Sequence, residues 1–434
     1  MIQNNWINDL QLKWGRMQQA MQQMEADGCL LTVDVNLYYT TGRIFSGYFY
    51  LPVEGKPWFF VKRPNGLKGE QVIYIRKPEQ MPELFAANGL KMPEKLLLEA
   101  DELSYNDYIR LQAVFQPKVT ANATALMRKL RQVKTPYEIE QFRISAKQHA
   151  KTYAEVPSCF RTGMTDLEFQ AEIERRMRLN GSFGMFRAFG ANMDIFMGSV
   201  LAGDNAETPS PFDFALGGQG MDSSCPLGAN GTVLKEGTAI MVDMAGNYTA
   251  YMTDMTRVFS VGKLTDLAYR AHQTSLKIQS EIENVARPGT SCAELYNIAL
   301  QITESEGLES YFMGTKQQAK FVGHGIGIQI NELPVLTPRS KSPRSSRCPF
   351  RHPVRHGCPD GNCTGRPGCA RAAPDHRPSS PWQKRAAPVW PRRHSSYTAH
   401  AQAARTARAP PGTGEIYPHP PDPRPWPCRR ADCA

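Results

Sequence analysis

The sequence is poor in cysteine and histidine over most of its length. It has 434 residues, and the first 338 hold only four of its ten Cys and three of its nine His. Four Cys are too few for a disulfide framework in so long a segment, which argues against a disulfide-rich secreted scaffold. No apolar run approaches the roughly 20 residues of a membrane helix, and Met1 to Arg16 lacks the apolar core of a signal peptide. We therefore expect a soluble, cytoplasmic protein without a membrane partner.

The tail, residues 339–434, lacks the large apolar side chains that a folded core needs. It has no Leu and no Met, yet it holds 18 of the 33 Pro and 18 Lys+Arg against five Asp+Glu. Its net charge is +13, whereas residues 1–338 carry −3, so the excess of positive charge belongs to the tail alone. This composition predicts a disordered basic segment rich in Arg, Pro and Cys.

Three interpretations of the tail are open. A genuine basic tail would bind nucleic acid or membranes through its charge. A zinc module would use Cys358, Cys363 and Cys369 with His352, His356 or His376, although this spacing lacks the paired Cys-x-x-Cys of zinc sites. We favour the third interpretation, translation out of frame, because 16 Arg against two Lys, together with Pro, Ala and Gly, is typical of GC-rich coding DNA read off frame.

The first third of the chain has the pattern of a mixed α/β domain. Met17 to Met24 places three Met at helical spacing, which predicts a buried helix face. Apolar runs at 29–35, 48–53 and 58–62 predict strands, and the turn residues between the last two predict a hairpin. We assign this N-terminal domain to residues 1–128.

The second domain is assigned to residues 129–338. Thr135, Pro136 and Glu138 form a capping box that predicts the start of a helix. Further caps at Thr165 and Ser291, and a long helix from about 265 to 286, surround a strand-rich stretch. This order of elements predicts an α+β domain.

Two carboxylates lie on the arms of a predicted hairpin in this domain. Asp243 interrupts the apolar run Ala239–Gly246, and Asp254 follows on the return arm. A buried ionised carboxylate is costly unless it is paired or binds a metal. Either Arg257 neutralises Asp254 while Asp243 caps a turn, or the two carboxylates converge on a metal ion.

A histidine between glycines is the third candidate ligand. His324 lies between Gly323 and Gly325, where a ligand or another backbone segment can approach closely, whereas His149 and His272 lie on predicted helices. A lone His is usually a structural residue. Together with two converging Asp, it predicts an Asp/Asp/His metal site.

These motifs resemble the pita-bread metallohydrolases, which include Xaa-Pro aminopeptidases, prolidases, methionine aminopeptidases and creatinase. The resemblance covers about residues 1–338 and includes the join from Leu130 to Glu140. It implies an α/β creatinase-like N-terminal domain and an α+β pita-bread catalytic domain that is incomplete at its C-terminal end. It also implies two divalent metal ions (Mn, Co, Fe or Zn): Asp243 would chelate one, Asp254 would bridge both and His324 would bind the other.

The sequence departs from the family pattern in three places. The family uses two further metal-binding Glu after the histidine motif, but after Pro338 this chain has only Glu415. Asn331 replaces a substrate-side His of the family and is our candidate substrate-binding residue. The stretch Cys225–Gly228 lies where aminopeptidases and prolidases commonly carry another His.

The resemblance implies metal-dependent aminopeptidase- or dipeptidase-type hydrolysis of peptide bonds, similar to Xaa-Pro aminopeptidases. We expect impaired activity, because two metal-binding Glu are missing, and no catalytic base is assigned. The alternatives are a non-catalytic binding protein that keeps the fold and a creatinase-like C–N hydrolase. The expected partner is a peptide substrate, a homodimer is compatible with the resemblance, and nucleic acid is expected only at the basic tail.

Limited proteolysis tests the prediction for the tail. We expect a resistant fragment that ends near Ser340, because the residues beyond it cannot bury an apolar core. Mass spectrometry of the digest measures that end point, and a protected tail would contradict the prediction.

Overall fold

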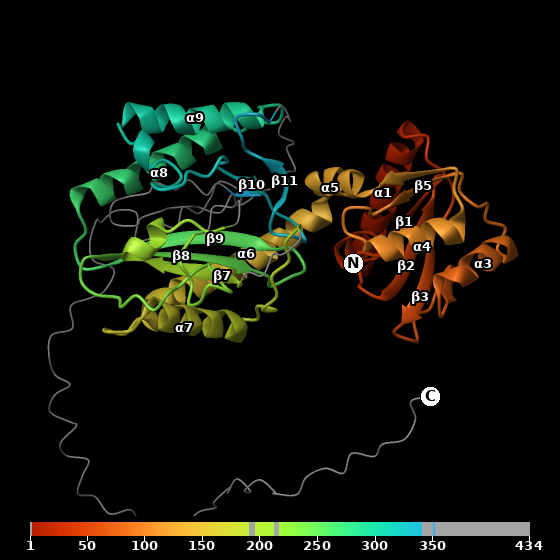
Figure 1. Ribbon diagram of the computed structural model, residues 1–434, viewed down its shortest axis with the longest axis horizontal. Coiled ribbons are helices and arrows are strands. Elements are labelled where there is room, and N and C mark those ends of the chain that lie inside the picture. Colours follow the sequence, from red (N-terminus) through yellow and green to blue (C-terminus); the bar gives the residue numbers. More distant parts are fainter. Residues whose placement is uncertain (1, 191–195, 212–216, 341–349, 352–434) are drawn as a thin grey trace, which may run out of the picture. The chain divides into compact units, whose positions relative to one another are not determined.

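A computed structural model describes residues 2–190, 196–211, 217–340 and 350–351 of the chain (Figure 1). The predictions for the tail beyond Arg351, including its interpretation as an out-of-frame segment, lie outside these residues. The boundary between residues 128 and 129 stays a prediction. Within the described ranges, no helix is both long and apolar enough to cross a membrane.

The N-terminal part is built on one six-stranded sheet with the order β4-β3-β2-β1-β5-β6. Its strands are β1 (Gly28–Leu31), β2 (Ser46–Pro52), β3 (Trp58–Arg63), β4 (Val72–Tyr74), β5 (Lys95–Leu98) and β6 (Val119–Asn122). Strands β1, β2 and β3 pair antiparallel, whereas β4, β5 and β6 each join a parallel neighbour. The predicted hairpin is therefore confirmed as β2–β3.

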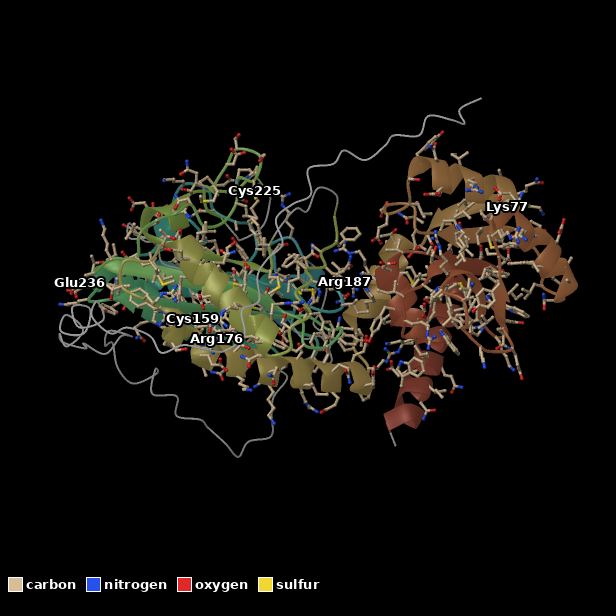
Figure 2. All side chains as sticks on the ribbon, turned by 90° about the horizontal axis from the view of Figure 1, so that it is seen from below. Lys77, Cys159, Arg176, Arg187, Cys225 and Glu236 are labelled. Atoms are coloured by element: carbon tan, nitrogen blue, oxygen red, sulfur yellow. The ribbon has the colours of Figure 1, made fainter. Side chains whose placement is uncertain are left out.

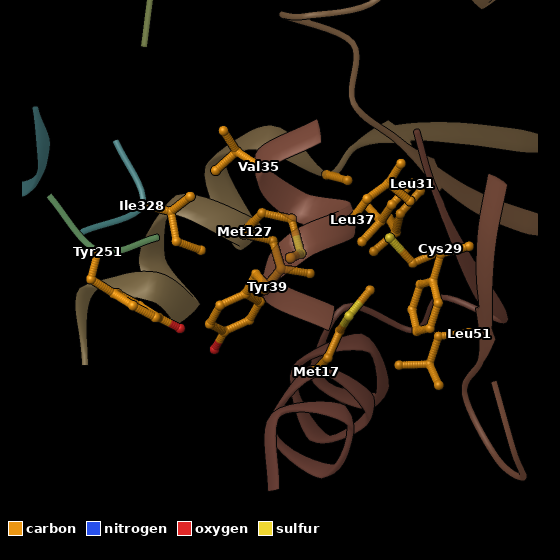
Figure 3. Close-up of a cluster of buried hydrophobic side chains, with 14 of the residues drawn as sticks. Met17, Cys29, Leu31, Val35, Leu37, Tyr39, Leu51, Met127, Tyr251 and Ile328 are labelled. Carbon is orange, nitrogen blue, oxygen red and sulfur yellow. The ribbon is translucent and has the colours of Figure 1, made fainter. Parts of the chain in front are cut away.

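Helices cover both faces of this sheet. They are α1 (Ile2–Gln23), α2 (Asp34–Thr41), the 3₁₀ turn η1 (Pro78–Gln80), α3 (Met81–Ala87) and α4 (Tyr105–Phe115). Side chains alternate along a strand, so Leu31 packs with Met17 and Met21 of α1 in one buried cluster, drawn in Figure 3. Leu30 points to the other face and packs with Phe85 of α3. The Met stripe is thus core, as predicted.

The C-terminal part combines helices with two three-stranded sheets, ordered β7-β8-β9 and β11-β10-β12. Its elements are α5 (Thr124–Gln132), α6 (Pro136–Cys159), α7 (Asp166–Leu179), β7 (Gly198–Ala202), η2 (Gly203–Glu207), β8 (Thr238–Gly246), β9 (Thr253–Val261), α8 (Asp266–Val285), α9 (Cys292–Ser305), η3 (Glu309–Tyr311), β10 (His324–Gly325), β11 (Glu332–Val335) and β12 (Phe350–Arg351). The predicted capping boxes at Thr135 and Thr165 are confirmed.

The two faces of the β7–β9 sheet carry different layers. Ile240 and Val242 belong to a cluster with Phe169 of α7, and α6 contributes to the same cluster. Ala239 points the other way and packs against Ala268 of α8. Figure 1 shows α7 on one side of the sheet and α8 and α9 on the other. Asp243 shares the parity of Ala239, so it faces the α8–α9 side.

The capping box of α6 provides a test of the fold. Thr135 is fully buried, and its side chain accepts a hydrogen bond from the Glu138 amide. Thr135→Ala should therefore lower the free energy of unfolding by about 1–2 kcal/mol, measured by urea denaturation. Ser158→Ala, at an exposed serine of the same helix, should change it by less than about 0.5 kcal/mol. Equal effects of the two substitutions would contradict the assignment of the cap.

Candidate metal centre

The register of the β8–β9 hairpin sets both candidate carboxylates on one face of the sheet. Asp243 lies opposite Thr256, and Asp254 lies opposite Ala245. Positions two apart along a strand share a face, so the two Asp are diagonal neighbours on the same side. Their exposed fractions are only 3% and 4%, so both carboxylates sit in a protein interior.

A hydroxyl on the neighbouring strand orients the first carboxylate. Thr256 donates a hydrogen bond from its Oγ1 to Oδ1 of Asp243, with a donor–acceptor distance of 2.6 Å. The interaction is buried and holds one oxygen of Asp243. This hydrogen bond restricts the orientation of the carboxylate, whose oxygens can accept several bonds.

The backbone of β10 fixes the orientation of the His324 ring. His324 Nδ1 lies 3.0 Å from the Gly325 carbonyl oxygen, and a carbonyl can only accept, so Nδ1 carries the proton. In the neutral ring, the lone pair is then on Nε2, which lies 3.6 Å from Oδ2 of Asp254. Two groups that both present lone pairs are favourable at this distance only with a proton or a cation between them.

The structure brings two of the three predicted ligands together. Asp254 and His324 are within ion-pair distance, whereas Asp243 is one diagonal step away on the same face. Among the residues that the structure describes, no three His, Cys, Asp or Glu side chains are close enough to hold one metal ion. Ligation by Asp243, Asp254 and His324 together stays a prediction.

The glycines beside His324 are required by close packing within this motif. A Cβ on Gly325 would lie 2.1 Å from the Leu333 carbonyl oxygen, and a Cβ on Gly327 would lie 2.0 Å from the Glu332 carboxylate. Another strand of the same motif therefore occupies the space that these glycines leave. The sequence pattern indicated a close approach without showing that β11 supplies it.

Asn331 pairs with a neighbouring backbone segment. Its Oδ1 accepts from the Phe189 amide at 2.7 Å, and its Nδ2 donates to the Phe189 carbonyl at 2.9 Å. Ile330 also donates its amide to the Arg187 carbonyl, and Arg187 is labelled in Figure 2. These contacts use the side-chain amide of Asn331 to hold residues 187–189. Its role in substrate binding stays a prediction.

A buried ion-pair cluster next to the histidine motif was missed by sequence reasoning. The Glu332 carboxylate lies 2.8 Å from Lys134 Nζ and 3.3 Å from Arg131 Nε, and all three side chains are at most 2% exposed. Burial raises the pKa of Glu332, but Lys134 and Arg131 outweigh it and hold that pKa below its usual value. Arg131 also donates to Asn36 of α2. In the sequence, the only sign of this cluster is the pair of basic residues, Arg131 and Lys134, shortly before Thr135.

Two further departures from the family pattern are the stretch Cys225–Gly228 and the lone Glu415. Cys225 is a half-buried free thiol on the loop before β8 (Figure 2), and Gly228 of this loop accepts a hydrogen bond from Asn205 Nδ2 at 2.9 Å. Glu415 lies outside the described residues.

Comparisons with known families agree with this architecture. The profile of the Creatinase/Prolidase N-terminal domain matches residues 13–133, and that of Metallopeptidase family M24 matches residues 140–349. Fold and motif thus define a two-domain metallopeptidase of the creatinase type. The chain belongs to metallopeptidase family M24, whose members are hydrolases that use divalent metal ions.

Individual relatives are distant but cover most of the chain. The Xaa-Pro dipeptidase of Pyrococcus furiosus is 25% identical over 73% of this chain and 82% of its own length, and an uncharacterized peptidase of Bacillus subtilis is 23% identical over 76% and 86%. The solved Xaa-Pro dipeptidase from Bacillus anthracis superposes with a TM-score of 0.66 at 20% identity, covering 82% of this chain and 92% of that one. This superposition confirms the predicted fold.

The ion pairs of Glu332 generate a pH-dependent prediction. At pH 7, Glu332→Gln should lower the free energy of unfolding by about 3–5 kcal/mol, because it leaves two buried cations without their anion. The folded-state pKa is depressed below the ordinary 4.5. This stabilisation is therefore present above that pH and is lost as the pH falls through the folded-state value.

Urea denaturation between pH 3 and 7 measures this effect. Glu140→Gln is the control, because its ion pair with Arg143 is more than half exposed and should contribute less than about 1 kcal/mol. An equal, pH-independent effect of both variants would show that Glu332 is not held as a buried anion.

Proposed function

We propose that this chain is a metal-dependent peptidase that cleaves next to the N-terminus of Xaa-Pro peptides, with Asp243, Asp254 and His324 as metal ligands. The observation that carries the proposal is the approach of His324 to Asp254, on the sheet face that also bears Asp243. The distant relatives that are Xaa-Pro dipeptidases support the choice of substrate.

The donor chemistry fits a divalent ion. Two carboxylates and one imidazole suit Mn, Co, Fe or Zn, and their burial removes the water that would compete for such an ion. A bound ion of this kind would supply a polarised substrate carbonyl and a water of lowered pKa.

The residues themselves have separate roles in this proposal. Thr256 holds one oxygen of Asp243 and so restricts the orientation of the carboxylate. The Gly325 carbonyl holds the proton of His324 on Nδ1 and directs Nε2 toward Asp254. Glu332, with its two cations, holds β11 against β10 and so supports the position of His324.

We expect the activity to be low. The family pattern includes two further Glu ligands, and after Pro338 the sequence has only Glu415. Loss of outer-shell partners alone commonly lowers metal affinity or activity by about 10–100-fold, and loss of direct ligands should cost more. Hydrolysis of an Xaa-Pro dipeptide with added Mn²⁺ should therefore be far slower than for enzymes with a full set of ligands.

Manganese uptake tests the proposed ligands directly. After equilibration with Mn²⁺ and gel filtration, elemental analysis should find metal bound to the 434-residue protein and much less bound to Asp254→Asn. Asp34→Asn, at an exposed carboxylate of α2, should bind as the unmodified chain does. Uptake that is unchanged in Asp254→Asn would contradict the proposal, and the melting temperatures of both variants show whether each is folded.

A further inference from the structure

Ser199 of β7 carries a buried hydroxyl that the structure leaves without a hydrogen-bond partner. Ser199 is 1% exposed, and among the described residues its Oγ has no hydrogen-bond partner. Such a hydroxyl costs about 1–3 kcal/mol relative to one that is satisfied. A buried polar atom of this kind therefore calls for a reason.

The register of the sheet gives Ser199 a specific neighbour. Ser199 lies directly opposite Asp243 on one side, and Thr256 lies directly opposite Asp243 on the other. The three side chains form a row on one face across β7, β8 and β9. Residues directly opposite each other have Cβ atoms about 4.5–5.5 Å apart, so rotation about χ1 of the serine brings a hydroxyl within reach of the carboxylate.

Gly228, on the loop before β8, lies close to this hydroxyl. A Cβ added to Gly228 would lie 3.4 Å from Ser199 Oγ, and Gly228 has a φ of +87°, a conformation that favours glycine. The Gly228 carbonyl already accepts hydrogen bonds from Asn205 Nδ2 and from the Gly220 amide. The strand register instead places Ser199 beside the Asp243 carboxylate, which can accept a hydrogen bond from it.

We propose that Ser199 is a positioning residue for the metal centre: its hydroxyl donates to the Asp243 carboxylate when that carboxylate holds a divalent cation. This inference rests on the proposed function. Thr256 secures Oδ1 of Asp243 from β9, and Ser199 secures the carboxylate from β7. Hydrogen bonds from both neighbouring strands restrict the ligand to one orientation, which raises metal affinity without adding a ligand.

Three variants of the full-length chain test this role: Ser199→Ala, Ser199→Thr and the control Ser275→Ala. Ser275 is also 1% exposed, but it lies on α8 and donates to the Ala271 carbonyl. The dissociation constant for Mn²⁺ is measured by electron paramagnetic resonance, and the melting temperature is measured without metal. We expect about a tenfold weaker affinity in Ser199→Ala, within the usual range for outer-shell partners. Ser199→Thr keeps the hydroxyl and should bind as the unmodified chain does.

The metal-free melting temperature separates positioning from a structural role. Because no described residue hydrogen-bonds to Ser199 Oγ, Ser199→Ala should not lower that temperature, whereas Ser275→Ala should. Unchanged Mn²⁺ affinity in Ser199→Ala would overturn the inference and leave the proposed function intact. A lower metal-free melting temperature in Ser199→Ala, together with weakened Mn²⁺ affinity in Ser199→Thr, would also overturn it. That result would show a structural role for the serine. Absence of Mn²⁺ binding by the unmodified chain would overturn both.

Discussion

The structure of the C-terminal part depends on holding two carboxylates, Asp243 and Asp254, as diagonal neighbours on one buried face of a sheet. Like charges in such surroundings repel, so the arrangement is stable only with positive charge or protons close by. Thr256 donates one hydrogen bond to Asp243, and the glycine-rich strand brings Nε2 of His324 to 3.6 Å from Asp254. In our account, a divalent cation completes the balance.

Glu332 is also a buried carboxylate, but its negative charge is balanced by cations of the chain itself. It is as deeply buried as Asp243, but Lys134 and Arg131 supply its positive charge from within the chain. These cations come from α5 and the turn that follows it, while Arg131 also donates to Asn36 of α2. This cluster therefore joins the N-terminal segments to the strand next to His324 and has a structural role, whereas we propose a metal-binding role for Asp243 and Asp254.

Local features of the fold were predictable, whereas long-range pairings were not, except for the approach of His324 to Asp254 that the family resemblance implied. The capping boxes of Thr135 and Thr165 and the β2–β3 hairpin depend on residues a few positions apart, so the sequence displays them directly. The shared face of Asp243 and Asp254 follows from the parity of one hairpin. The partners of Glu332 lie 198 residues away at Lys134, and Asn331 binds Phe189 across 142 residues. Such pairs are fixed by packing, which no local pattern reveals.

A crystal structure of the chain grown with Mn²⁺, measured at the manganese absorption edge, tests the central claim most directly. We expect an anomalous peak between Asp254 and His324, with Nε2 of His324 as a ligand and the Asp243 carboxylate turned toward the ion. An empty site at saturating Mn²⁺, with a proton shared between His324 and Asp254, would contradict it. A peak bound elsewhere would contradict it equally.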